Sequence, residues 1–264
     1  MAEILRIERT GPVARIWLDR PDVRNALNGA VIRDLSAAFA AIAEDAKDGR
    51  VRAVVLGGSG KAFCAGADLA FMREMGGNTW EQNRADAEKL AAMLWTMFSC
   101  PVPVVARIHG DCYAGGVGLA AVCDIRIATG GATFCLSEAR LGLLPATISP
   151  YVVRAMGEQA SRRWFVTAER FDAVAAKACG FVHEVVAAET LDAKVDEIVA
   201  AIVANGPMAT MACKQLVQDV AGREITAELR SETARRIADI RASEEGQEGV
   251  KSFLEKRKPR WVNS

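Results

Sequence analysis

Two stretches of the chain place glycines where a short apolar strand is followed by a helix. The first, VVLGGSGKAFCAGADL, ends in a loop at 65–68, and the second, VVARIHGDCYAGGVGL, leads to Gly115 at the start of a predicted helix. The first N–H groups of a helix have no intrahelical partner and lie at the positive end of its dipole. Each junction therefore offers backbone donors to a negatively charged oxygen. When either junction is considered alone, its glycines can also be explained by close packing of the backbone against a neighbouring segment.

Neither junction has the sequence of a nucleotide-binding loop. No Gly-Lys-Ser/Thr follows the glycines, and no G-x-G-x-x-G is followed by an acidic residue about 20 positions later. The two histidines, His109 and His183, lie in strand-like segments without a partnered nucleophile, so we do not expect a Ser–His–Asp triad. We interpret Asp111 and Asp124 as turn or capping residues.

Charge and composition exclude several classes of protein. Lys plus Arg and Asp plus Glu both number 33, so no net field attracts nucleic acid or an anionic membrane. The seven cysteines are odd in number and lack metal-ligand spacing, which favours reduced thiols and no bound metal. MAEILRIERT lacks the features of a signal peptide, and no apolar run approaches the ~20 residues of a membrane span. We expect a soluble cytoplasmic protein.

The order of predicted elements indicates an α/β fold. EILRIERTGPVARIWLDR predicts a strand hairpin, and Asn28 is a plausible N-cap for a helix that places Val31, Leu35, Phe39 and Ile42 on one face. Further strands are predicted over 51–58, 102–110, 124–129 and 132–138, a loop over 59–69, and a helix over 79–99. Beyond Pro150 helices predominate, with only FVHEVV strand-like. Strands alternating with helices favour parallel crossover units.

Three blocks of the sequence together resemble the enoyl-CoA hydratase/isomerase (crotonase) superfamily. FCAGADL, AGGVGLAAVCDIRIA and FCLSEARLGLLP stand in the order of that family's active-site blocks, and the likeness extends from RPDVRNALN to SEEGQEGVKSFLEKRKPRW. The resemblance implies a crotonase-like core of repeated ββα units over 1–190, which carries an acyl-CoA site. It also implies a C-terminal helical trimerisation segment over 191–264, with homotrimers or hexamers formed as dimers of trimers.

The resemblance also implies catalytic roles for Ala67, Gly115 and Glu138. The backbone N–H groups of Ala67 and Gly115 would bind the thioester oxygen as an oxyanion hole. Glu138 matches the third-block glutamate, and its nearly uncharged neighbours favour a raised pKa suited to proton transfer. The second glutamate of many family members falls on Gly118, which has no side chain.

A single carboxylate leaves three functions open. A lyase would add or remove water across the 2,3 double bond of an enoyl-CoA, and the stretch from FCLSEARLGLLP through PATISPYVV resembles bacterial methylglutaconyl-CoA hydratases. A Δ3,Δ2-enoyl-CoA isomerase would use Glu138 as its sole proton shuttle. A non-catalytic acyl-CoA-binding protein would keep the oxyanion hole alone. We favour the hydratase.

Residues along the three blocks and the tail are expected to contact the acyl-CoA. Arg24 and Ala26 match the segment that lies along the pantetheine and phosphates, and Phe253 and Lys256 match tail residues at the nucleotide end, often from a neighbouring subunit. The full set expected to bind substrate is Arg24, Ala26, Ala65, Asp68, Leu69, Gly116, Phe253 and Lys256. Coenzyme A is part of the substrate, so no separate cofactor is expected.

Overall fold

A large mixed sheet runs through the core of the protein. The computed structural model describes residues 4–262. Its six-stranded sheet has the order β1-β2-β3-β5-β7-β10, in which β1 and β2 are antiparallel and the other neighbours are parallel. The strands are β1 (Leu5–Thr10), β2 (Val13–Leu18), β3 (Ala53–Gly58), β5 (Val104–Ile108), β7 (Ile125–Thr129) and β10 (Glu184–Val186). The predicted hairpin and parallel crossovers are confirmed.

A second, smaller sheet carries the two glycine-containing loops singled out in the sequence. Its order is β4-β6-β8-β9, with β4, β6 and β8 parallel and β9 antiparallel to β8. The strands are β4 (Ala62–Cys64), β6 (Asp111–Tyr113), β8 (Thr133–Cys135) and β9 (Arg170–Asp172). The prediction of an unbroken loop over 59–69 was wrong, because β4 lies within it. Three-residue strands are too short to show a periodicity.

The helices follow these strands in repeated ββα units. One strand of the large sheet, one strand of the small sheet and a helix succeed one another three times, at β3-β4-α2, β5-β6-α4 and β7-β8-α5. The helices are α1 (Gly29–Lys47), α2 (Leu69–Met75), α3 (Trp80–Phe98), α4 (Gly115–Ala121), α5 (Ser149–Thr167), α6 (Ala173–Ala178), α7 (Leu191–Ala204), α8 (Pro207–Val220), α9 (Ala227–Ala242) and α10 (Glu244–Leu254). This arrangement confirms the predicted core of ββα units.

The parallel strands are buried on both faces, which accounts for their uninterrupted apolar sequences. On one face, Ala53 and Val55 of β3 pack with Leu191, Val195 and Val199 of α7. On the other face, alternate residues of β3 join a core that includes Phe39 of α1 and Met93 of α3. The Asn28 side chain accepts the amides of Ala30 and Val31, as its predicted role as N-cap requires.

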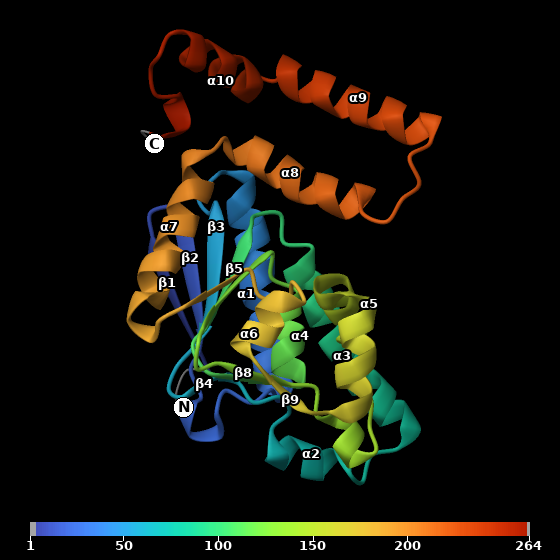
Figure 1. Cartoon of the computed structure of the whole chain (residues 1–264). Helices are drawn as coiled ribbons and strands as arrows, with labels where there is room; N and C mark the ends of the chain where they lie inside the picture. The colour runs from blue at the N-terminus through green and yellow to red at the C-terminus, as the bar shows by residue number, and fades with distance from the viewer. Residues whose placement is uncertain (1–3, 263–264) are drawn as a thin grey trace.

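The last three helices form one end of the molecule, where α8 packs against the rest of the protein. In Figure 1, α9 and α10 lie beyond α8 at one end of the molecule, whereas α2 and β4 lie at the other end. The predicted division at residue 190 falls before α7, which covers the large sheet, and α8 begins at Pro207. The exposed apolar side chains of α8–α10 include Met208, Val217, Ile237, Val250, Phe253 and Leu254.

The interior uses cysteine as a small apolar residue. Cys64 and Cys112 are fully buried on β4 and β6, and all seven cysteines lie in the described range with free thiols. Burial raises the pKa of the Cys64 thiol to about 12. Residues 4–262 hold no group of three His, Cys, Asp or Glu side chains suited to a metal ion. None of the helices in this range is long and apolar enough to cross a bilayer.

Candidate active site

The two glycine-containing loops lie against each other at the end of the small sheet. β4 and β6 are adjacent and parallel, so the loops that follow them leave the sheet at the same edge. A Cβ placed on Gly66 would lie 3.7 Å from the nitrogen of Gly115, and only 2.9 Å from the Cβ of Ala114. Gly66 has φ +91°, a conformation that L side chains rarely adopt. The fold therefore brings together the two junctions singled out in the sequence.

The amides of Ala67 and Gly115 are left without partners while their neighbours are bonded. Within residues 4–262, the N–H of Asp68 donates to the Leu27 carbonyl at 2.8 Å and the N–H of Ala114 donates to the Cys135 carbonyl at 2.7 Å. Neither Ala67 nor Gly115 donates a hydrogen bond in the same range. Two adjacent unpaired amides in partly open positions form a suitable site for an oxyanion.

The backbone beside Gly115 is strained. Ala114 has φ 47° and ψ −116°, although it carries a side chain. Such conformations cost roughly 1–3 kcal/mol and persist where the surrounding structure imposes them. A Cβ on the following Gly116 would lie 2.4 Å from the Cys64 carbonyl oxygen, so only glycine fits there. The packing and donor explanations of these glycines are therefore compatible.

Glu138 follows β8, whose last residue is bonded to the loop of Gly115. It begins a 3-10 helix (Glu138–Leu141) three residues after Cys135, whose carbonyl accepts the Ala114 amide. Its Oε2 is buried and has no hydrogen-bond partner among the described residues. Burial raises the pKa of the Glu138 carboxyl, and only its own backbone N–H opposes this. An unpaired buried carboxylate with a raised pKa is typical of a general acid or base.

An isoleucine occupies the space over Gly118. Gly118 is buried on α4, and a Cβ added there would lie 2.2 Å from Cγ2 and 2.8 Å from Cβ of Ile148. Ile148 is 2 % exposed at the N-terminus of α5. No other charged side chain in the described chain shifts the pKa of Glu138. The space over Gly118, where the resemblance places a second acid, is therefore filled by an apolar side chain.

The residues expected along the substrate fall into two groups. Arg24, Ala26, Ala65 and Asp68 lie together, since the Ala65 amide donates to the Arg24 carbonyl at 3.0 Å and Leu27 bonds to both Gly66 and Asp68. Arg24 is exposed, Leu69 is 70 % exposed on α2, and Gly116 is buried beneath Cys64. Phe253 lies on α10 and Lys256 just beyond it. Figure 1 shows α10 at the opposite end of the molecule from α2 and β4.

The prediction that Asp111 is a turn or capping residue was wrong, because Asp111 lies in strand β6. The polar side chains to which no catalytic role was given are bonded within the protein. Asp111 accepts hydrogen bonds from the hydroxyls of Tyr113 and Thr133, and Asp124 pairs with Lys214 at 2.7 Å. His183 accepts the Arg126 amide, and His109 bonds to the Gly60 carbonyl. Sequence reasoning missed Ile148 and Arg20.

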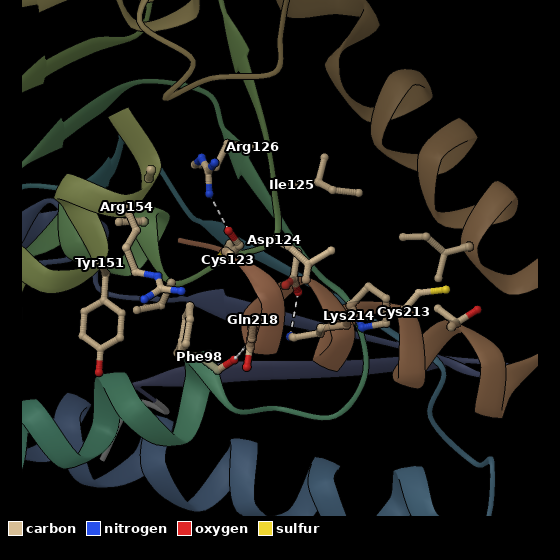
Figure 2. Close-up of a pocket in the computed structure, with 18 residues that line it drawn as sticks. Phe98, Cys123, Asp124, Ile125, Arg126, Tyr151, Arg154, Cys213, Lys214 and Gln218 are labelled. Carbon is tan, nitrogen blue, oxygen red and sulfur yellow. Dashed lines mark hydrogen bonds and ion pairs between the residues drawn. The ribbon is translucent and has the colours of Figure 1, made fainter. Parts of the chain in front are cut away.

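A cavity of about 520 Å³ lies elsewhere in the molecule. Figure 2 shows its lining residues, which come from the ends of α3 and α4 and from α5 and α8. It lies at the opposite end of α4 from Gly115. Its Lys214 ammonium already has partners within the protein, because it donates to the Asp124 carboxylate and to the Val102 carbonyl. The unpaired carboxylate and amides of the candidate site are not part of it.

Comparisons with known proteins show the family of the chain. A sequence model of the family described as enoyl-CoA hydratase/isomerase matches residues 8–264. The chain belongs to the enoyl-CoA hydratase/isomerase family.

Individual relatives resemble the chain over almost its whole length. The short-chain-enoyl-CoA hydratase of Clostridium acetobutylicum is 31% identical over 258 residues, which cover 96% of this chain and 95% of the relative. The crotonyl-CoA hydratase of Syntrophomonas wolfei is 29% identical over 263 residues, 99% of this chain and 98% of the relative. The crystal structure of an enoyl-CoA hydratase from Shewanella pealeana is 39% identical with a TM-score of 0.93, covering 98% of this chain and 96% of that one.

Proposed function

We propose that the protein is an acyl-CoA lyase that adds or removes water across the 2,3 double bond of an enoyl-CoA. The observation that carries this proposal is the buried Glu138 Oε2, which has no partner among the described residues. Glu138 stands three residues after Cys135, whose carbonyl accepts the Ala114 amide in the loop of Gly115. Relatives named as hydratases support water as the second reactant. For the acyl group we propose a branched, acidic chain such as methylglutaconyl, on the likeness of the third block.

The reaction requires an oxyanion hole and one proton carrier. The amides of Ala67 and Gly115 hold the thioester oxygen, and Glu138 takes a proton from water as the water oxygen attacks C3. The electron pair of the double bond moves onto the carbonyl oxygen as an enolate, which each backbone donor stabilises by roughly 3–4 kcal/mol. The protonated Glu138 then delivers its proton to C2 and the carbonyl re-forms. Glu138 ends the cycle ionised, and elimination runs the same steps in reverse.

A Δ3,Δ2-enoyl-CoA isomerase is the second candidate, and Ile148 is the observation that favours it. An apolar wall over Gly118 leaves no second acid to hold water. In this alternative Glu138 removes a proton from C2 and returns it to C4 through the same enolate. A non-catalytic acyl-CoA-binding protein is the third candidate, and it predicts binding without turnover.

We further propose how the substrate and the subunits are arranged. Arg24, Ala26, Ala65, Leu69 and Gly116 would follow the pantetheine and acyl chain, with coenzyme A as part of the substrate and no separate cofactor. Phe253 and Lys256 would contact the nucleotide end of an acyl-CoA bound to a neighbouring subunit. The exposed apolar side chains of α8–α10 support assembly as a homotrimer or a hexamer. We propose a cytoplasmic location.

A substrate screen tests the proposal. Purified protein is assayed with 3-methylglutaconyl-CoA, crotonyl-CoA and 3-hexenoyl-CoA, and products are separated by chromatography. We expect 3-hydroxyacyl-CoA to form from a 2-enoyl-CoA, fastest with the acidic acyl chain. A protein that only moves the double bond of 3-hexenoyl-CoA would contradict the hydratase and establish the isomerase.

The pH profile tests the role of Glu138. The raised pKa means that this carboxylate begins to protonate at a higher pH than an ordinary glutamate. Because the ionised form accepts the proton of water, we expect kcat/KM for hydration to fall as the pH drops through a pKa above ~4.3, the value of an unperturbed glutamate. A profile that stays flat down to that value would contradict the assignment.

A further inference from the structure

The Arg20 side chain links the two segments that flank Ala67. Arg20 follows β2, and its Nη1 donates to the Ala26 carbonyl at 2.5 Å while Nη2 donates to Asp68 Oδ2 at 2.7 Å. The other carboxylate oxygen of Asp68 accepts the Ala70 amide at 2.9 Å. The two side chains are only 20% and 9% exposed. One guanidinium therefore ties the 24–27 segment to the C-terminal side of the loop.

Asn25 makes the segment around Arg20 rigid. It is 1% exposed and has φ +58°. Its Oδ1 accepts the Arg20 amide at 2.9 Å, and its Nδ2 donates to the carbonyls of Ser59 and Ala62 at 2.8 Å each. A side-chain amide bonded on both ends holds its backbone in one conformation. The backbone from which the Arg20 side chain extends is therefore held in place.

The bridge between Leu27 and Ala67 sets the direction of the Ala67 amide. Leu27 donates to the Gly66 carbonyl at 2.7 Å and accepts from the Asp68 amide at 2.8 Å. In this parallel pattern one residue forms both bonds, and the residue opposite directs its own N–H and C=O away. Ala67 is the opposite residue. The N–H of Ala67 shares a peptide plane with the Gly66 carbonyl, so the bond from the Leu27 N–H to that carbonyl fixes its direction. The Leu27 N–H in turn shares a peptide plane with the Ala26 carbonyl that Arg20 binds.

We infer that Arg20 is a positioning residue that, through the Ala26 carbonyl and Asp68, aims the Ala67 amide at the substrate oxygen. This role rests on the proposed function of the Ala67 amide. The planar guanidinium forms two bonds in fixed directions at once, to a carboxylate and a carbonyl, and lysine cannot reproduce that geometry. Within residues 4–262, Asp68 has no other basic partner.

Three variants and one control separate positioning from general stability. Arg20→Gln removes the charge, and Arg20→Lys keeps the charge but not the planar guanidinium that forms two bonds at once. Asp68→Asn keeps a side-chain oxygen that can accept the Ala70 amide. Arg107→Gln is the control, because Arg107 makes a forked ion pair with Asp192 between β5 and α7, with its side chain 15% exposed. The measurements are thermal unfolding, kcat, CoA affinity, and the carbonyl stretching frequency of bound isotope-labelled butyryl-CoA, which lacks a reacting double bond.

The carbonyl frequency is the readout that a merely structural role would not move. We expect wild-type protein and Arg107→Gln to lower it equally on binding. Arg20→Gln is expected to lose much of this shift and to lower kcat roughly 10- to 100-fold, while its affinity for CoA is kept. Arg20→Lys and Asp68→Asn are expected to give intermediate shifts and intermediate kcat values. If Arg20→Gln does not fold, the other two variants decide. Retention of the full shift and of kcat would overturn the role of Arg20 alone, whereas a wild-type protein with no shift would overturn the oxyanion hole itself.

Discussion

Glu138→Gln is expected to lower kcat for hydration by about 10²–10⁴-fold while binding of acyl-CoA persists. The amide keeps the shape of the side chain but cannot accept and return a proton, and the backbone donors of Ala67 and Gly115 are unchanged. Steady-state kinetics and titration calorimetry with a saturated acyl-CoA measure the two effects separately. Glu158→Gln, which removes an exposed carboxylate paired with Arg162 on α5, is the matched control.

The same substitution is expected to stabilise the fold at neutral pH. A carboxyl whose pKa is raised by folding stabilises the native state below its unfolded pKa, and this contribution is lost as the pH rises through the folded pKa. The buried charge therefore weakens the wild-type protein near pH 7, and glutamine relieves it. We expect a gain of roughly 0.5–2 kcal/mol in the free energy of unfolding, the scale of stabilising changes at strained active sites.

Denaturant unfolding at two pH values checks the sign. The difference between wild type and Glu138→Gln should shrink when the pH is lowered below ~4, where an ordinary glutamate is itself largely protonated. A variant that loses stability at neutral pH would show that Glu138 is a structural carboxylate. Full activity with stability unchanged would remove it from the mechanism.

Gly118→Ala is expected to destabilise the protein by about 1–3 kcal/mol, because the new methyl group would overlap Ile148. The added Cβ would lie 2.2 Å from Ile148 Cγ2, and both residues are buried. Ile148→Ala alone leaves a cavity and is expected to cost about 2–5 kcal/mol. In the double variant the new methyl group fills part of that cavity, so its cost should be smaller than the sum by about 0.5–3 kcal/mol.

Chemical denaturation of the four proteins of this cycle measures the coupling. Gly131→Ala is the control, since a Cβ at Gly131 meets no atom within 4 Å. Additive costs at positions 118 and 148 would show that Ile148 does not fill the space over Gly118. A positive coupling would establish that the apolar wall, and not glycine alone, excludes a second acid from this site.

The larger elements could be predicted because their sequences carry the signal locally. The helix after Asn28 has its cap, its first turn and its buried stripe of Val31, Leu35 and Phe39 within a few turns. The parallel strands show as uninterrupted apolar runs because both of their faces are covered. β4, β6 and β9 could not be predicted in this way, because each depends on pairing with distant partners. β8 and β10 are equally short but lie within the longer strand-like stretches ATFCLSE and FVHEVV.

The candidate site was predictable only in part. The free amides follow from strand-to-helix junctions whose glycines are visible in the sequence. Arg20 lies 48 positions from Asp68 and Ile148 lies 30 positions from Gly118, so these contacts exist only after the sheets and α5 have packed. Nothing in the local sequence of LDRPD or PATISP specifies those partners. Whether the predicted site residues act on an acyl-CoA stays a prediction.

The buried thiols beneath the two loops give the site a chemical consequence of its own. Cys64 and Cys112 lie on β4 and β6, directly before the segments that carry the free amides, and both are fully enclosed. Electrophiles and oxidants need a thiolate they can reach, and with its pKa near 12 Cys64 offers none at neutral pH. The Cys64 thiol thus resists alkylation for as long as β4 and β6 stay paired. The labelling rate of Cys64, compared with that of exposed Cys213, would measure how often the two strands separate.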